Sequence, residues 1–420
     1  MDNNYVKNKL YAIIDEHADD VVDLCSKLIR INSENPPGNM DEIIKFICNY
    51  LDDKSIHYEV LEPEKGRLNI VASIGKQNGK TLIINGHVDV VPAGDMTKWD
   101  FDPFSGKVEN GKILGRGASD MKGGIAGVLY AIGLLADEGI ELNGKAVLTI
   151  VTDEEISGDK GTKWLVEKYG IKGDACIVAE PTDRDNCEIG QRGTLWLKVF
   201  SKGISAHGSL CPYAGKNAIT NIIKFIDKLD TLRGMKAKYP KEIAGIIEDS
   251  KRAAKDILKN DGTENVIDHV TINVGTIKGG VKTNMIPDYA EAEIDIRIPI
   301  GISTAMIIDS INSIINEMGI NSISYEYSWR SEPNYTDSKA LIVETLSSNV
   351  EKIINKKMTR TYQWASSDAR YFRYAGIPTL QYGPANTEGI HAYNETVDVK
   401  DLVDAAKVYA GTIIDFLNNK

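Results

Sequence analysis

Histidines and carboxylates stand close behind several short apolar runs of the sequence, at positions where buried strands would end. Imidazole nitrogens and carboxylate oxygens are donors that suit zinc, cobalt or manganese, and no cysteine shares these positions. We therefore expect a metal site without thiolate ligands. The candidate ligands are His87, Asp120, Glu155, Glu180 and His391.

Asp120 is the best candidate for a ligand that two ions share. A carboxylate can bind one ion with each oxygen, whereas an imidazole normally binds one. Asp120 lies in the turn GRGASDMKGG, whose glycines permit unusual backbone angles and a close approach. The sequence therefore favours a dinuclear site, with ions roughly 3.5–4 Å apart.

Two further carboxylates are candidates for roles beside the metal. Glu154 and Glu155 are adjacent at an expected strand end, so one can bind metal while the other stays free. A free carboxylate beside metal-activated water is a general base, and we assign that role to Glu154. Asp89 lies two residues after His87 and can hydrogen-bond the far ring nitrogen, which would fix the tautomer.

The elements that must position these residues alternate between strands and helices. This alternation predicts an α/β fold, with a mixed and mainly parallel sheet flanked by helices. Ligands bind outside the carboxyl ends of the strands in such sheets, so distant segments can deliver side chains to one edge. The expected strands are 56–61, 68–74, 81–86, 145–152, 174–179 and 377–382, and the expected helices are 4–30, 40–51, 121–137, 160–169, 338–355 and 399–418.

The pattern changes near residue 190 and resumes near residue 330. Between these points the order strand, helix, strand, strand, helix, strand is typical of an α+β ferredoxin-like domain. We predict a catalytic domain in two parts, 1–189 and 331–420, interrupted by an inserted domain at 190–330. The inserted domain has expected strands at 194–201, 268–277, 287–297 and 322–328, helices at 215–232 and 303–318, and a polar, helical insertion at 234–265.

The bulk composition bounds the function. The chain has 420 residues, which favours two domains. Its net charge of −11 argues against a nucleic-acid or anionic-membrane partner. Five scattered cysteines predict reduced thiols, and no apolar run suits a signal peptide or a membrane span. We therefore expect a cytoplasmic protein.

At this point the sequence resembles the ArgE/DapE-type amidohydrolases, or M20 metallopeptidases, which include acetylornithine deacetylases and succinyl-diaminopimelate desuccinylases. The resemblance covers nearly the whole chain. It rests on GHVDVVPAG, GRGASDMKGG, TDEEISGDKGT, AEPT, SAHGS and a late histidine, in the family's order.

The resemblance implies a division of the ligands between two divalent ions, most often Zn²⁺, with Co²⁺ or Mn²⁺ as alternatives. His87, Asp120 and Glu180 would hold one ion, and Asp120, Glu155 and His391 the other. It also implies a cis peptide bond after Asp120.

The resemblance further implies catalytic roles. Glu154 would take a proton from metal-activated water and return it to the leaving amine, and Asp89 would orient the metal-binding histidine. The family generally forms homodimers through the inserted domain, which also serves as a lid. His207, in SAHGS, would then stabilise the oxyanion in the partner's active site.

Substrate contacts are implied by likeness to the desuccinylases, which bind the substrate carboxylate with arginines and an asparagine. The matching residues are Arg192, Asn284 and Arg297. Arginine presents a bidentate fork that suits a carboxylate.

The expected activity is hydrolysis of an amide bond in a small N-acyl amino acid or diamino acid, by a deacetylase or desuccinylase. An aminoacylase, carboxypeptidase or dipeptidase acting on a short peptide is the alternative within the same chemistry. A catalytically silent relative that binds metal or an amino acid is the alternative from another class. Such a relative is expected to lose its base or a ligand, and here all of them are present.

Overall fold

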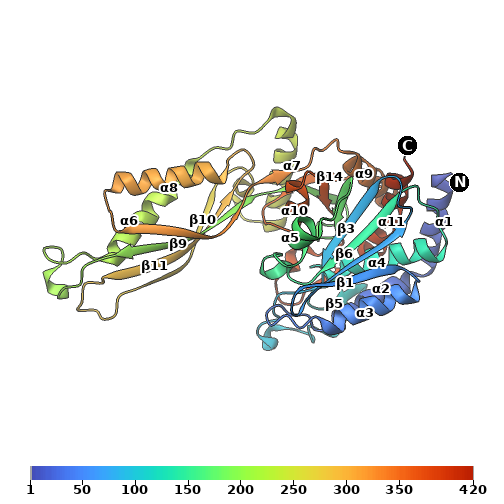
Figure 1. Cartoon of the computed structure of the whole chain (residues 1–420), viewed down its shortest axis with the longest axis horizontal. Helices are drawn as coiled ribbons and strands as arrows, with labels where there is room; N and C mark the ends of the chain where they lie inside the picture. The colour runs from blue at the N-terminus through green and yellow to red at the C-terminus, as the bar shows by residue number, and fades with distance from the viewer. Residues whose placement is uncertain (1, 420) are drawn as a thin grey trace. The chain divides into compact units, whose positions relative to one another are not determined.

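The computed structural model describes residues 2–419, which divide into two compact units (Figure 1). The first unit contains the chain up to Ile189, then Tyr335–Thr361 and the residues from Ser367 onward. The second unit contains Gly190–Asn334 together with Tyr362–Ser366. Each unit is described separately below.

The centre of the first unit is a parallel sheet. Its four neighbouring strands run parallel in the order β6, β3, β7, β15. The strands consist of short apolar runs that are almost entirely buried, as expected for a sheet covered on both faces. Their bounds are β3 Thr81–His87, β6 Lys145–Val151, β7 Ala175–Val178 and β15 Thr379–Gln381.

Helices pack against both faces of this sheet. On one face Ile83 of β3 packs in a core with Phe372 of α10. On the other face Gly86 of β3 lies against Ile125 of α4, so closely that a side chain at Gly86 would clash. The helices of this unit are α1 Asn3–Glu16, α2 Ala18–Arg30, α3 Asp41–Asp53, α4 Lys122–Asp137, α5 Thr162–Trp164, α9 Leu341–Ile354, α10 Ala369–Tyr374 and α11 Val399–Asn418.

The outer strands correct the expectation of a mainly parallel sheet. β1 pairs with β2, β2 with β6, and β15 with β8, all in the antiparallel sense. The sheet is therefore mixed, and its parallel part is confined to the centre. The outer strands are β1 His57–Glu64, β2 Arg67–Gly75, β8 Asn186–Gln191, β13 Asn334–Tyr335 and β14 Thr359–Gln363.

A separate small sheet was not expected from the sequence. It contains β4 Lys107–Glu109, β5 Lys112–Leu114 and β16 Thr396–Asp398, in the order β16, β5, β4. Strands of three residues are too short to produce a recognisable periodicity. This sheet joins the segment before Asp120 to the segment after His391.

The expected helix at 4–30 is two helices. His17 separates α1 from α2, with φ −111° and ψ 32°. Asp19 and Asp20 lie in the first turn of α2, where negative charge favours the start of a new helix. Similarly, the expected helix at 160–169 is one α-helical turn followed by a π-helical turn, Leu165–Tyr169.

The second unit contains a four-stranded antiparallel sheet in the order β10, β11, β9, β12. Alternate residues of β9 and β11, such as Leu197 and Ile294, form one core with Phe225 of α6 and Ile307 of α8. The elements are β9 Gly193–Lys202, α6 Ala218–Leu229, α7 Ala244–Leu258, β10 Thr271–Gly279, β11 Tyr289–Ile298, α8 Thr304–Met318 and β12 Ile323–Ser331.

Short helical turns connect the main elements of both units. They are η1 Met96–Lys98, η2 Glu154–Ile156, η3 Leu165–Tyr169, η4 Gly208–Leu210, η5 Asp230–Gly234, η6 Lys241–Ile243, η7 Thr263–Val266 and η8 Thr387–Gly389. Within residues 2–419, none of the helices has the length and apolar character needed to cross a membrane.

A buried acid in the first unit generates a prediction about pH. Glu188 of β8 is buried and accepts a hydrogen bond from Gln381 at 2.7 Å. Burial raises the pKa of Glu188 to about 8, despite the opposing charge of Arg373. In the unfolded chain Glu188 has the ordinary, lower pKa of a glutamate and releases its proton above that value. The folded protein still holds this proton. This contribution to stability is complete at low pH and is lost as the pH rises toward about 8.

The unfolding free energy of the wild type should fall between pH 5 and pH 9. We predict that in Glu188→Gln this fall is smaller by at least about 1 kcal/mol, the equivalent of one pKa unit. Chemical unfolding at both pH values measures this effect. Exposed Glu141 gives the control variant Glu141→Gln, which should follow the wild type. An equal pH dependence in all three proteins would contradict the prediction.

Candidate metal centre

The carboxyl ends of the central strands deliver two of the candidate ligands. His87 is the last residue of β3, and Glu180 follows β7 by two residues. Glu154 and Glu155 were expected at the end of β6, but they lie beyond it. That strand ends at Val151, and the pair lies in the turn η2 that follows it.

Asp120 and His391 come from loops outside the central sheet. Asp120 precedes α4, and its peptide bond to Met121 is cis, as the resemblance implies. His391 follows η8 and has a φ of 58°. This left-handed backbone is uncommon for a residue other than glycine and is found mostly where the surrounding structure enforces it.

Asp120 lies between the two histidines. Its Oδ1 is 3.1 Å from Nε2 of His87, and its Oδ2 is 3.2 Å from Nε2 of His391. The two oxygens of one carboxylate therefore face different imidazoles. This is the arrangement that a bridging carboxylate requires.

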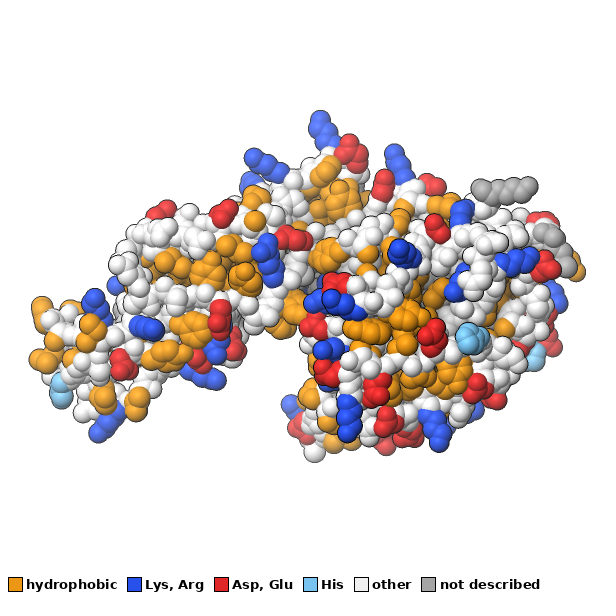
Figure 2. Space-filling view, in the orientation of Figure 1, with side chains coloured by type: hydrophobic (Ala, Val, Ile, Leu, Met, Phe, Trp, Pro, Cys, Tyr) orange, Lys and Arg blue, Asp and Glu red, His pale blue; other side chains and the backbone are white. Residues whose placement is uncertain are grey.

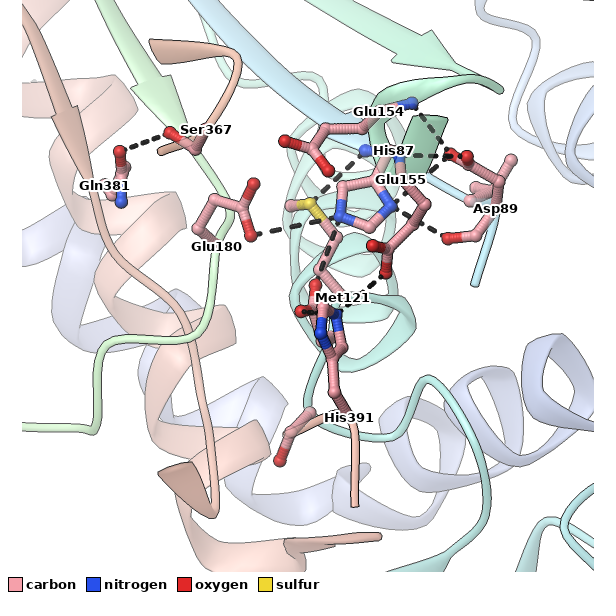
Figure 3. A network of polar contacts seen from close by, with 12 residues as sticks. His87, Asp89, Met121, Glu154, Glu155, Glu180, Ser367, Gln381 and His391 are labelled. Atoms are coloured by element: carbon pink, nitrogen blue, oxygen red, sulfur yellow. Dashed lines mark hydrogen bonds and ion pairs between the residues drawn. The ribbon is translucent and has the colours of Figure 1, made fainter. Parts of the chain in front are cut away.

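The other two candidate ligands complete a group on each side of Asp120. Oε2 of Glu180 is 3.9 Å from Nε2 of His87, and Oε1 of Glu155 is 3.2 Å from Nε2 of His391. Donor atoms of His87, Asp120 and Glu155 lie within 4.8 Å of one another. The five candidates are thus brought together as two overlapping groups, and Figure 3 labels four of them, His87, Glu155, Glu180 and His391.

The tautomer of His87 is set by its neighbour. Nδ1 of His87 lies 2.8 Å from the main-chain oxygen of Asp89, which can only accept, so Nδ1 carries the proton. In the neutral imidazole, Nε2 is then the nitrogen with the lone pair, on the side of Asp120 and Glu180, and it can bind a metal ion. The carboxylate of Asp89 is farther from Nδ1, at 3.5 Å.

The carboxylate of Asp89 also holds the turn that bears the two glutamates. It accepts the backbone N–H groups of Glu154 and Glu155, each at 3.2 Å, and the side-chain amide of Asn35 at 3.0 Å. In Figure 3 the two glutamate side chains leave this turn in different directions, and that of Glu155 extends toward His391. These contacts fix the backbone of both residues.

Positive charge near the candidate ligands stabilises their buried carboxylates. Burial raises the pKa of Glu180 well above its ordinary value, and the charge of Asp120 raises it further. Hydrogen bonds to Asp120 and Glu155 raise the pKa of His391 to about 11. For Asp120, burial is outweighed by the hydrogen bonds from His391 and His87, which hold its pKa below the ordinary value.

These shifts test whether a metal fits. Crowded, buried carboxylates are stabilised by nearby cations, and here protonated imidazoles supply the charge. Divalent cations supply more charge and bind the same nitrogen and oxygen atoms, with histidines deprotonated. The donor set of two imidazoles and three carboxylates therefore fits a pair of divalent ions.

The remaining predicted residues lie in the second unit. Asn284 and His207 are adjacent there, because the main-chain oxygen of Asn284 accepts the N–H of Gly208 at 2.8 Å. Both side chains are exposed. Nδ1 of His207 accepts the N–H of Ser209 at 3.3 Å and lies 2.7 Å from its hydroxyl, so its proton lies on Nε2.

Arg192 and Arg297 make contacts within their own unit. The buried guanidinium of Arg192 donates from Nη2 to the main-chain oxygens of His269 and Arg297, at 2.9 and 2.8 Å. Nε of Arg297 donates to the carboxylate of Asp295 at 2.9 Å. These contacts position both side chains without any substrate.

Sequence reasoning missed several residues that contact the centre. Glu395 accepts the N–H of Asp120 at 3.1 Å, and the sulfur of Met121 accepts the N–H of His87 at 3.3 Å. Asn35 contacts Asp89, as described above. The only sequence signal for Glu395 is its place four residues after His391.

Comparison with known proteins identifies the class of this centre. The model of peptidase family M20/M25/M40 matches residues 83–415, so the chain belongs to that family. It is a metal-dependent amidohydrolase or peptidase, and the prediction of family and enzyme class is confirmed.

Individual relatives share most of the chain. A succinyl-diaminopimelate desuccinylase of Ehrlichia ruminantium is 29% identical over 95% of this chain and 98% of its own. An M20 metallo-carboxypeptidase of Sulfolobus solfataricus has a TM-score of 0.79 at 22% identity, over 93% and 97% of the two chains. A dinuclear metal-binding M20 peptidase of Bacillus subtilis has a TM-score of 0.69 at 16% identity, over 97% and 100%. The two structures show a shared fold.

The position of Asp120 between the histidines generates a prediction about metal binding. We predict that His391→Ala lowers the bound Zn²⁺ from two ions per chain to one, because one group of ligands stays intact. Asp120→Ala should weaken both ions, because it removes the ligand that the two groups share. Metal analysis after equilibrium dialysis measures the stoichiometry. Two ions retained in Asp120→Ala would contradict a shared ligand.

Proposed function

We propose that this protein hydrolyses the amide bond of a small N-acyl amino acid or diamino acid, with two divalent ions bound at the centre around Asp120. The observation that carries the proposal is the contact of one carboxylate, through its two oxygens, with His87 and His391. The Bacillus subtilis relative is a dinuclear metal-binding peptidase, which supports a pair of ions here as well. We infer Zn²⁺ as the native metal, with Co²⁺ or Mn²⁺ as alternatives.

The proposed roles follow from the geometry of the donors. His87, Asp120 and Glu180 would hold one ion, and Asp120, Glu155 and His391 the other. When bound, the ions supply Lewis acidity, which polarises an amide carbonyl and lowers the pKa of a water molecule. The proposal therefore needs a base beside the ions that is not itself a ligand.

Glu154 is our proposed base. Its backbone is fixed by Asp89, and its side chain leaves the turn in a different direction from that of Glu155 (Figure 3). Burial raises the pKa of Glu154 well above its ordinary value, while the nearby charge of His87 lowers it. Bound cations would lower it further, toward the value that a general base needs near neutral pH. Glu154 would take the proton of the water and deliver it to the leaving amine.

We propose that the second unit, as an inserted domain at 190–330, acts as a lid and forms a homodimer. Within its loop 203–216, Ile204 pairs with Lys216, and this loop pairs with the loop 280–286 through His207 and Met285. Figure 2 shows hydrophobic side chains at the end of this unit where these loops lie. The exposed apolar residues there are Ile204, Leu210, Tyr213, Val281 and Met285. Such a surface favours burial against another protein surface.

In such a dimer, His207 would stabilise the oxyanion in the partner's active site with a hydrogen bond donated by its Nε2–H. The hydrogen bonds of Ser209 to Nδ1 support this role, because they leave the proton on the outward nitrogen. Arg192, Asn284 and Arg297 would contact the substrate carboxylate. The catalytic domain would then consist of 1–189 and 331–420.

The desuccinylase relative favours an N-succinyl substrate, and the carboxypeptidase relative favours a short peptide as the alternative.

A cytoplasmic location remains a prediction, supported by the five free cysteines. A catalytically silent relative is disfavoured, because the sequence retains the proposed base and every proposed ligand. The metal-loaded enzyme should hydrolyse at least one member of a panel of N-acetyl, N-succinyl and dipeptide substrates. Failure on the whole panel, with two metals bound, would favour the silent alternative.

Glu154→Ala tests the assigned base. We predict that this variant binds two metal ions like the wild type and loses at least about 100-fold in turnover number, the lower range for a general base. Metal analysis and initial rates on the best substrate of the panel measure both quantities. Glu59→Ala, an exposed change in β1, is the control. Turnover close to the wild type in Glu154→Ala would exclude the role.

Mixing two inactive variants tests the role of His207. We predict that His207→Ala lowers turnover and that co-refolding it with Glu154→Ala restores part of the activity. A mixed dimer contains one active site with an intact Glu154 and an intact partner histidine. Each variant refolded alone should stay inactive. Absence of any recovery, although mixed dimers form, would contradict a histidine supplied by the partner.

A further inference from the structure

Glu395 is a fully buried carboxylate that the proposed catalytic cycle does not use. One oxygen, Oε1, accepts the N–H groups of Ser119 and Asp120, at 2.9 and 3.1 Å. The other, Oε2, accepts a hydrogen bond from Nη1 of Arg116 at 2.7 Å. Glu395 therefore binds the backbone of the turn that presents Asp120.

Arg116 is itself buried, with 2% of its surface exposed. Its guanidinium lies over the ring of Trp99, 5.1 Å from the centroid. A buried ion pair is rarely more stabilising than apolar side chains of the same volume, because both charges lose their hydration. Stability alone is thus a weak reason for this pair, and the fixed geometry that it provides is a stronger one.

The same carboxylate belongs to the loop that carries His391. The main-chain oxygen of Glu395 accepts the N–H of Gly115 at 3.0 Å, and Thr396 pairs with Leu114 in the small sheet. Both loops have irregular backbone, with a φ of 58° at His391 and 84° at Gly117. Besides the pairing of Thr396 with Leu114, Ser119 links the two loops, because its Oγ donates to the main-chain oxygen of Thr396 and accepts the N–H of Asn386, each at 2.8 Å.

We propose that Glu395 is a positioning residue that holds the turn of Asp120 and the loop of His391 in register, so that both face the same cation. The inference rests on the proposed function, because the cations belong to that proposal. Glu395 acts only through the backbone of Ser119 and Asp120, since its oxygens are occupied by these amides and by Arg116.

Loss of the Glu395 carboxylate should lower the affinity for one ion more than for the other. On the side of His87, Asp120 has a second anchor, because the N–H of His87 donates to the sulfur of the neighbouring Met121. On the side of His391, the loops are joined by the pairing of Thr396 with Leu114, and Glu395 is the charged group that binds the N–H of Asp120 itself. Loss of this carboxylate should therefore weaken the ion of Asp120, Glu155 and His391 more than the other.

Calorimetric titration of the metal-free full-length protein with Co²⁺ tests the proposal, together with the visible absorption of the bound Co²⁺. Glu395→Gln removes the charge, and Glu395→Asp keeps the charge but draws the carboxylate away from the amides. We expect both variants to bind the second Co²⁺ about 10- to 100-fold more weakly, with the first nearly unchanged. The absorption band of the second ion should also shift, which a purely structural role would not cause.

Asp404→Asn is the matched control. Asp404 is a buried carboxylate of the same unit, and it forms ion pairs with Arg184 at 2.8 Å, Lys400 at 2.6 Å and Lys407 at 3.8 Å. This variant should bind both ions like the wild type. Thermal unfolding of the metal-free proteins checks that each variant is folded.

The outcomes separate the two proposals. A wild type that binds fewer than two Co²⁺ ions overturns the proposed dinuclear function and this inference with it. A wild type with two ions, and Glu395 variants with unchanged affinities and spectra, overturns this inference alone. Unfolded Glu395→Gln and Glu395→Asp beside a folded Asp404→Asn also overturn it, because Glu395 would then be a folding residue.

Discussion

The contact of one carboxylate with two imidazoles is the interaction on which the centre depends. Asp120 lies 3.1 Å from His87 and 3.2 Å from His391, through different oxygens. Buried carboxylates repel one another unless positive charge lies between them. The raised pKa of His391 and the lowered pKa of Asp120 are two consequences of this one constraint. Divalent cations bound to the same atoms would offset the repulsion between the carboxylates more fully than the protons on the histidines do.

The fold meets this constraint with two different devices. The parallel strands β3 and β7 end at the same edge, which brings His87 and Glu180 together, and the turn after β6 adds Glu155. This device is general for open parallel sheets. Asp120 and His391 instead come from loops, and the antiparallel pairing of β5 with β16 brings those loops together.

Buried carboxylates with no proposed metal contact fix the backbone around the ligands. Asp89 accepts the N–H groups of Glu154 and Glu155, and Glu395 accepts those of Ser119 and Asp120. A carboxylate that accepts backbone hydrogen bonds in a buried place is held strongly, because its charge strengthens each bond. The ligands are thus oriented by the main chain as well as by their own rotamers. In the second unit, a separate core forms between the sheet of β9 and β11 and the helices α6 and α8.

The sequence by itself determined the residue types of the centre and much of the central fold. Apolar runs before His87, Glu155 and Glu180 marked the buried strands, and the glycines around Asp120 marked a turn. Family membership, also inferred from the motifs, is confirmed by the family comparison. These features are local, because strand periodicity and turn composition are contained in a few consecutive residues.

Tertiary structure alone decided the contacts between distant segments. Asp120 and Glu395 are 275 positions apart, so their hydrogen bond leaves no local pattern. The carboxylate of Asp89 was expected on His87 and lies closer to the amides of the Glu154 turn, since the backbone path after β6 decides which group it reaches. The antiparallel outer strands and the small sheet β16–β5–β4 also depend on pairing partners. Register and pairing are set by long-range packing, which residue types and spacing do not encode on their own.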